Sequence, residues 1–196
     1  MNKRSIAMTI VILGALLLGA LPAQAASRYE WSDPKGDATY VDVFANVTPS
    51  NPKFDITKVA MSSNEGVLTW AASVEALSAG TPRTSTGYFF RLAFTYAGAN
   101  YEFFVSEDGV RAGFALIRRG WPNGDAEIPC GRCTGVIDRK QHQVIVTAPI
   151  ASLGAATSIR AGSKLTGLSV LAQRQVGVLT LTSDEAYAPK NVAFEL

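Results

Sequence analysis

The chain has 196 residues with 18 basic and 16 acidic side chains, and it contains two cysteines and one histidine. Its first segment has the pattern of a secretory signal peptide. Lys3 and Arg4 precede an uncharged, mainly apolar run over 6–21, and residues 23–25 provide a small-residue cleavage site. The apolar run has 16 residues, which is shorter than the about 20 that span a bilayer.

Cleavage after Ala25 leaves residues 26–196, a chain of 171 residues with 16 basic and 16 acidic side chains. This zero net charge excludes a basic nucleic-acid-binding domain. Beyond the leader, no stretch of the sequence is long and apolar enough to enter a membrane. We therefore expect a secreted, extracellular protein with one domain over 26–196, which would bury about 70% of its unfolded surface.

The predicted elements of this domain are short strands separated by turn residues. In chain order, the predicted strands are 56–61, 67–74, 86–96, 101–106, 110–119, 134–138, 143–149, 164–173 and 192–196. Apolar side chains alternate within them, as Phe90, Leu92 and Phe94 show, and a turn at 64–66 joins the first two. One or two helical turns are expected from Ile150. About nine short strands predict an all-β fold, an antiparallel β-sandwich of the jelly-roll or immunoglobulin-like kind.

The segment "WSDPKGD" begins at Trp31 and places two carboxylates, Asp33 and Asp37, around Pro34 and Gly36. Calcium takes six to eight oxygen ligands, mainly carboxylates and backbone carbonyls, from loops that can fold around it. The segment does not match the EF-hand pattern. Two interpretations stay open, a calcium-binding loop and a simple Asp-Pro turn before a strand.

Cys130 and Cys133 form a C-x-x-C motif between Pro129 and a predicted strand. In an oxidising compartment this spacing favours a structural disulfide. A thiol–disulfide redox pair would normally place its first cysteine at a helix N-terminus, and no helix is predicted there. A half-site for a shared metal and two free thiols are the remaining alternatives.

The chain contains few residues suited to catalysis. His142 is the only histidine, in a predicted hairpin turn where we expect it to be solvated, and its being alone excludes a zinc site with several histidines. No nucleophile-elbow or phosphate-binding motif occurs. We expect a protein that is not an enzyme. The enzyme alternative is a thiol–disulfide oxidoreductase that uses Cys130.

Aromatic residues occupy successive positions at 89–90 and 103–104, so they point to both faces of their strands. One set would fill the core, together with Trp70. The other set either faces outward, where aromatic rings can stack on sugars or protein partners, or is covered within the sandwich. Asn46 begins an N-V-T glycosylation sequon.

The order of these segments is similar to that of secreted bacterial β-sandwich domains common in actinobacteria. The opening "DPKGD" and the later "DITKV" resemble carbohydrate-binding family 9 and DOMON-like sandwiches, and "SDEAYAP" precedes the last strand. The resemblance covers residues 31–189. It implies a calcium site whose ligands would be Asp33, Asp37, Asp55 and Asp184.

Taken together, these observations predict an accessory or binding module for a carbohydrate or a cell-envelope component. Calcium would be its only cofactor. An envelope domain that binds another protein through an edge strand is the alternative partner class. The ligand-binding residues and the oligomeric state stay unassigned.

Overall fold

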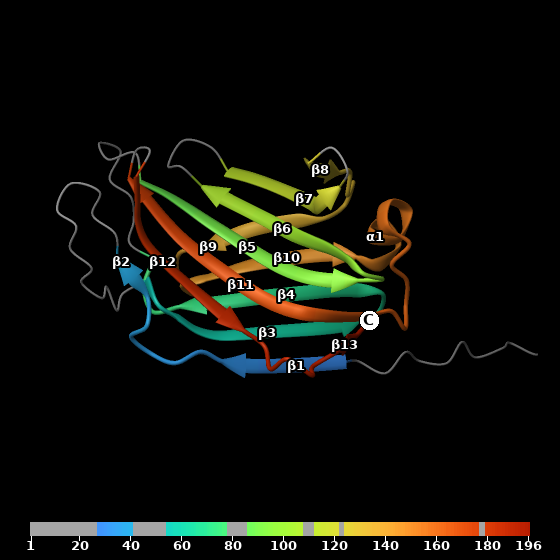
Figure 1. The fold of residues 1–196 in the computed structure, drawn as a ribbon, viewed down its shortest axis with the longest axis horizontal. Helices are drawn as coiled ribbons and strands as arrows, with labels where there is room; N and C mark the ends of the chain where they lie inside the picture. The colour runs from blue at the N-terminus through green and yellow to red at the C-terminus, as the bar shows by residue number, and fades with distance from the viewer. Residues whose placement is uncertain (1–26, 41–53, 78–85, 108–111, 122–123, 177–178) are drawn as a thin grey trace, which may run out of the picture.

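The chain folds into two antiparallel β-sheets that lie face to face, with one short helix (Figure 1). The computed structural model describes residues 27–40, 54–77, 86–107, 112–121, 124–176 and 179–196. The expected antiparallel β-sandwich is therefore confirmed. The predicted signal peptide and Asn46 lie outside the described residues.

The smaller sheet has five strands. Their order across the sheet is β1 (Ser27–Ser32), β3 (Ile56–Asn64), β4 (Val67–Val74), β10 (Gln143–Pro149) and β9 (Thr134–Asp138). Strands β3 and β4 form the predicted hairpin, in which Asn64 pairs with Val67. Glu65 and Gly66 form its two-residue loop with φ angles of 49° and 75°. Two positive φ angles define the turn that best matches the twist of a hairpin, and glycine adopts the second without strain.

The larger sheet has eight strands. Seven follow one another in the order β2 (Thr39–Tyr40), β12 (Leu179–Tyr187), β11 (Lys164–Val176), β5 (Thr86–Tyr96), β6 (Ala99–Glu107), β7 (Ala112–Trp121) and β8 (Gly124–Ile128). The eighth, β13 (Phe194–Glu195), pairs with β11. The described residues thus contain more strands than the nine expected, because β1, β2, β8 and β12 were not predicted.

The core lies between the sheets and is built from the inward residues of each strand. Phe94 is at its centre, with ring centroids 6.4 Å from Trp70, 5.4 Å from Tyr101 and 5.6 Å from Phe103. All four side chains are buried. Burying a side chain of this size contributes about 2–3 kcal/mol to folding, so the alternating aromatic residues account for much of the stability of the sandwich.

The helix α1 (Ile150–Thr157) follows β10 directly and has the two turns expected. Pro149 precedes it, and Ser158 ends it in the left-handed conformation, donating its backbone N–H to the carbonyl of Gly154. The helix is attached to the core through Ile150 and Leu153, both buried.

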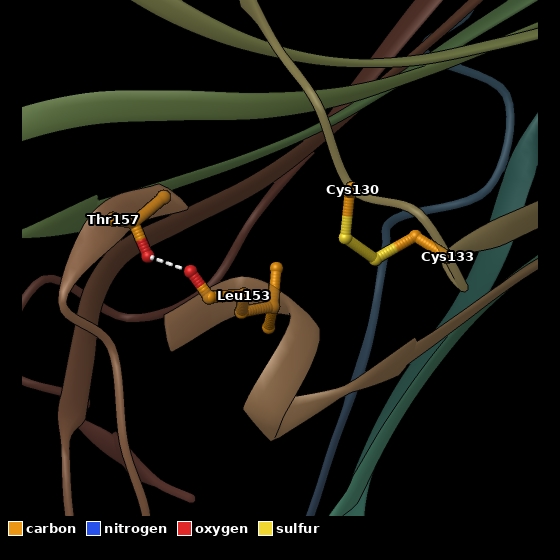
Figure 2. The surroundings of a disulfide bond; sticks show 4 residues. All are labelled: Cys130, Cys133, Leu153 and Thr157. Carbon is orange, nitrogen blue, oxygen red and sulfur yellow. Dashed lines mark hydrogen bonds between the residues drawn. A yellow bond between two sulfur atoms is a disulfide. The ribbon is translucent and has the colours of Figure 1, made fainter. Parts of the chain in front are cut away.

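The chain changes sheet several times, and two of these connections join edge strands at opposite edges of the sandwich. At one edge, residues 33–38 connect β1 of the smaller sheet to β2 of the larger sheet. At the other, residues 129–133 connect β8 of the larger sheet to β9 of the smaller sheet. A disulfide between Cys130 and Cys133 closes this second crossover, near α1 (Figure 2). These two connections are called the first and second crossover below.

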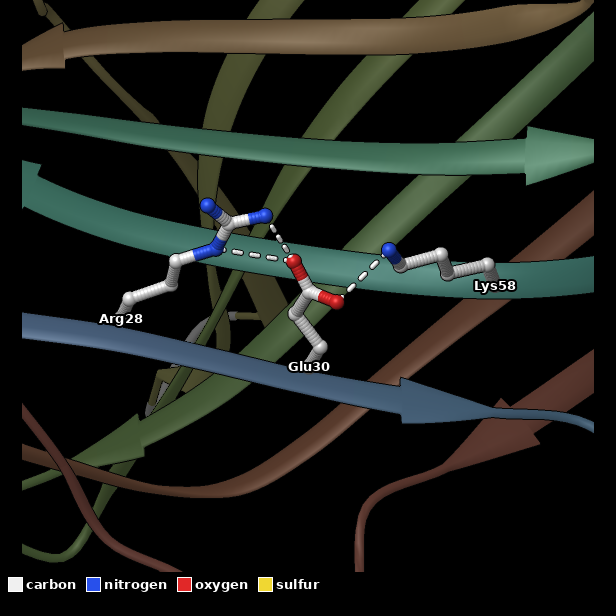
Figure 3. A network of polar contacts seen from close by, with 3 residues as sticks. All are labelled: Arg28, Glu30 and Lys58. Carbon is white, nitrogen blue, oxygen red and sulfur yellow. Dashed lines mark hydrogen bonds and ion pairs between the residues drawn. The ribbon is translucent and has the colours of Figure 1, made fainter.

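The outer face of the smaller sheet carries a charge network on β1 and β3. The carboxylate of Glu30 accepts a hydrogen bond of 2.8 Å from Nε of Arg28 and pairs with Nζ of Lys58 at 2.6 Å (Figure 3). These contacts lower the pKa of Glu30, the Lys58 bond first and the Arg28 bond second. Because the network is exposed to solvent, it contributes little to stability, and Glu30 is a suitable control carboxylate for the site described next.

Candidate metal centre

The first crossover is held in place by a buried carboxylate that precedes β3. Asp55 is fully buried, and its two oxygens accept hydrogen bonds from the backbone N–H groups of Gly36 at 2.9 Å and Ala38 at 3.3 Å. A carboxylate that accepts two backbone bonds is well compensated for its burial. Asp55 therefore gives the "DPKGD" loop its shape.

A second carboxylate joins the two sheets at the same edge. Asp184 is buried on β12 of the larger sheet, and its Oδ2 accepts a 2.6 Å hydrogen bond from the backbone N–H of Ile56, the first residue of β3. Its Oδ1 accepts a 3.0 Å bond from the N–H of Glu185. The start of β3 is thus tied to the crossover through Asp55 and to the opposite sheet through Asp184.

Three aspartates converge beside these contacts. One carboxylate oxygen from each of Asp33, Asp37 and Asp184 lies within 4.8 Å of the other two. Asp33 is half-buried, Asp37 is exposed and Asp184 is buried. We call these three residues the acidic triad. Asp55 stands outside this group of close oxygens, and its carboxylate accepts the two backbone hydrogen bonds that hold the loop.

The electrostatics of the acidic triad are unfavourable without a cation. Burial first, and then the negative charges of Asp184, Asp37 and Asp55, together raise the pKa of Asp33 to about 7. The pKa of Asp184 is also raised, mainly by burial, although its bond from Ile56 acts in the opposite direction. Oδ2 of Asp33 is buried and has no hydrogen-bond partner. Among the residues described, no ion pair involves any member of the triad.

The arrangement fits a hard cation such as calcium. Calcium–oxygen distances are about 2.3–2.6 Å, so two ligands on opposite sides of one ion lie at most about 4.6–5.2 Å apart. The 4.8 Å limit within the triad is compatible with that span. A bound cation would also supply the partner that Oδ2 of Asp33 lacks. Three carboxylates leave further positions for backbone carbonyls, water or a ligand.

The cysteine pair has the surroundings of a structural link rather than those of a reactive thiol. The two Cα atoms lie 5.3 Å apart, and the backbone N–H of Cys133 donates to the carbonyl of Cys130 at 3.0 Å. Both side chains are half-buried and pack against the core. The residues that follow form a turn and then β9, so no helix begins at either cysteine to favour a thiolate.

His142 is not the solvated turn residue that the sequence suggested. It adopts a positive φ of 52°, and its Nδ1 accepts a 3.1 Å hydrogen bond from the backbone N–H of Leu77. Its carbonyl oxygen accepts a further bond from Val74. The side chain is half-buried and serves as an acceptor for the end of the neighbouring strand. The hairpin pattern predicted that His142 lies in a turn. Its hydrogen bond with Leu77 could not be predicted, because the two residues are 65 positions apart in the sequence.

The aromatic residues divide as the alternation predicts. Trp31 and Trp70 are buried, so neither can stack on a ligand. The side chain of Trp121 lies outside the described residues. Phe89 and Phe104 point to the outer face of the larger sheet, where they are half-buried and their ring centroids are 5.9 Å apart. The outward set is therefore neither fully exposed nor fully covered.

Comparisons with known proteins add no relative. No protein-family model matches the chain, and neither the curated proteins nor the solved structures contain a match. The similarity to family 9 and DOMON-like sandwiches thus stays a prediction from short motifs. Within the described ranges, no helix has the length and apolar character needed to span a membrane.

Proposed function

We propose that this protein is an exported, non-catalytic binding module whose fold is completed by one calcium ion at the acidic triad. The observation that carries the calcium part is the buried, unpartnered Oδ2 of Asp33 beside two further carboxylates, Asp37 and Asp184. Burying negative charge without a partner costs several kcal/mol per ion, so these groups either take up a proton or bind a cation.

Export is consistent with this site. The leader pattern over 1–25 and the disulfide both suit an extracellular location. Extracellular calcium modules work with dissociation constants of about 10⁻⁴–10⁻³ M. Because Asp37 is exposed to solvent, the triad suits a solvent-accessible calcium site of such low affinity.

The binding role is supported by how the potentially reactive side chains are used. His142 accepts a backbone hydrogen bond, and the two cysteines are bonded to each other. The buried Glu102 is paired with Arg119 at 2.7 Å. These contacts stabilise the sandwich, and they engage the groups that an oxidoreductase or an acid–base enzyme would need free.

Calorimetric titration with calcium after removal of bound metal tests the proposal. We expect one ion to bind per chain, with a dissociation constant of about 0.1–1 mM. The Asp33→Asn variant should lose this binding, because it removes one charge with almost no change in shape. The Glu30→Gln variant, altered at a carboxylate on the adjoining strand, should bind as the unmodified protein does. Equal calcium binding by the unmodified and Asp33→Asn proteins would exclude the triad as the site.

A further inference from the structure

Strand β9 forms a free edge of the smaller sheet. It pairs with β10 on one side, and within the described ranges no strand pairs with its other side. An edge strand leaves every second backbone N–H and C=O group on its free side without a partner strand, so it can accept another strand. Strands β1, β2 and β8 form the other ends of the two sheet orders. How each edge is protected decides which one can pair with a second chain.

Charge or shortness protects the other three edges. Strand β1 has the charge network of Arg28 and Glu30, and β8 carries Asp125 and Glu127 among its five residues. Strand β2 has two residues. Natural sheets use such charges and such short strands to prevent pairing with a second chain. Strand β9, in contrast, has five residues and no charge before its last position, Asp138.

The two faces of β9 have different surroundings. Gly135 faces the core, because a Cβ atom there would meet side chains of β6 and β7. Ile137 packs against the core as well. Side chains alternate along a strand, so Val136 points to the outer face, where it is 55% exposed. An exposed valine in the middle of an edge without charge favours association with another strand.

A hollow of about 270 Å³ lies alongside β9. Gly135, Val136 and Ile137 line it from β9, and Val105 and Ala112 are among the residues of β6 and β7 that line it from the larger sheet. Since neighbouring residues of a strand point to opposite faces, a hollow bordered by all three lies beside the strand rather than over one face. Strand β10 occupies the other side of β9, and none of its described residues lines the hollow. The hollow therefore opens at the free side of β9.

The sequence of β9 is complementary to itself in the antiparallel direction. In a pair of β9 strands with a twofold axis at Val136, the two Val136 side chains meet on the outer face. Thr134 of one copy lies opposite Asp138 of the other, and its hydroxyl group can donate to that carboxylate. Ile137 of each copy lies opposite Gly135 of the other, on the inner side that borders the hollow. The missing side chain of the glycine leaves room for the isoleucine, so each position of the strand has a suitable partner.

We propose that two copies of this chain associate through antiparallel pairing of their β9 strands around Val136, which joins the two smaller sheets into one continuous sheet. The equal numbers of basic and acidic side chains over 26–196 give no net repulsion between the copies. The inference is independent of the proposed calcium site, which lies at the opposite edge of the sandwich. A strand of five residues forms a small interface, so we expect a dissociation constant of about 10⁻⁴ M.

Sedimentation of the disulfide-bonded protein from about 10 µM to about 1 mM measures this association. We expect mostly monomer at the lowest concentration and mostly dimer at the highest. Val136→Lys should weaken the association at least about tenfold, because two ammonium groups would meet at the axis. Tyr187→Lys is the matched control, since it places the same charge at the other exposed large side chain, on the larger sheet. It should associate as the unmodified protein does.

Thermal melts at about 10 µM separate association from folding. Because both substituted side chains are exposed, the two variants should melt with the unmodified protein. Amide hydrogen exchange then locates the contact. Exchange of β9 amides should slow between about 10 µM and about 1 mM, and exchange of β1 amides should not change.

A protein that stays monomeric at about 1 mM would overturn the proposal and leave a strand of a different protein as the partner of this edge. Equal dimerisation by Val136→Lys would show that the copies meet through another surface. Slower exchange in β1 instead of β9 would show the same.

Discussion

Asp33 is the residue on which the account of the metal site depends. Its pKa in the fold is about 7, whereas an unfolded aspartate has a pKa of about 3.9. The fold therefore favours the protonated form of Asp33. The resulting stability is present at low pH and is lost as the pH rises through about 7. Asp184 shifts in the same direction, so it contributes with the same sign.

The calcium-free protein should consequently become less stable as the pH rises from about 4 to about 7. Thermal melts in chelator across this range measure the effect. The Asp33→Asn variant cannot ionise at this position, so its melting temperature should fall less than that of the unmodified protein. In excess calcium the ion replaces the proton, and the stabilisation by calcium should grow as the pH rises. If the melting temperatures of the two proteins in chelator fell equally with pH, the pKa shift could not be assigned to Asp33.

At the level of elements, Gly135 at the start of β9, just after the second crossover, shows how closely the two sheets approach. A Cβ atom on Gly135 of β9 would lie 2.5 Å from Cδ2 of Phe114 and 2.6 Å from Cγ2 of Val105. Both neighbours belong to the larger sheet. Glycine at this position therefore lets β9 pack directly against β6 and β7.

Gly135→Ala should destabilise the protein by about 1–3 kcal/mol, because the new methyl group forces the two sheets apart. The matched control is Gly131→Ala in the adjoining second crossover, where a Cβ atom would have nothing within 4 Å. Denaturant unfolding of both variants measures the difference. If both variants unfolded at the same midpoint, close packing at Gly135 would not be the reason for glycine there.

Sequence patterns predicted some elements well and missed others for identifiable reasons. Strands β4 and β5 carry large apolar residues at every second position, as Leu68 and Trp70 or Phe90, Leu92 and Phe94 show, so their inward faces could be assigned in advance although Phe89 points outward. Strand β12 turns Thr182, Asp184 and Ala186 inward, and such polar and small residues do not produce a strand signal. Strands β1 and β8 are sheet edges, and most of their residues are only partly buried or exposed.

The same reasoning explains what could be predicted of the site. Asp33 and Asp37 are four residues apart in a turn, so the sequence places them together. Asp184 joins them only because β2 pairs with β12, which no local pattern reveals, and the family resemblance alone suggested it. The separate role of Asp55 depends on two backbone hydrogen bonds across the first crossover, and these follow from the folded loop.

For the whole molecule, the two crossovers connect the sheets at opposite edges of the sandwich. The acidic triad lies at the first and the disulfide closes the second. Replacing both Cys130 and Cys133 by Ser should cost about 2 kcal/mol, the value expected for a loop this short. Since the sites share no partner, the losses from this change and from calcium removal should add to within about 0.5 kcal/mol.

A double-mutant cycle in which calcium is one of the two changes tests this independence. The four states are the unmodified and the doubly substituted protein, each with calcium and with chelator. A coupling energy above about 1 kcal/mol would show that the crossovers act as one unit. Loss of calcium binding in the cysteine variant would show the same.

The most direct test of the central claim is a thermal melt in excess calcium and in chelator. With calcium at about 100 times its dissociation constant, folding should gain about 2.7 kcal/mol. For a chain of this length, that corresponds to a rise in melting temperature of about 5–11 °C. We expect this rise for the unmodified and Glu30→Gln proteins and no rise for Asp33→Asn. Identical melting temperatures of the unmodified protein in calcium and in chelator would show that the acidic triad holds no stabilising ion.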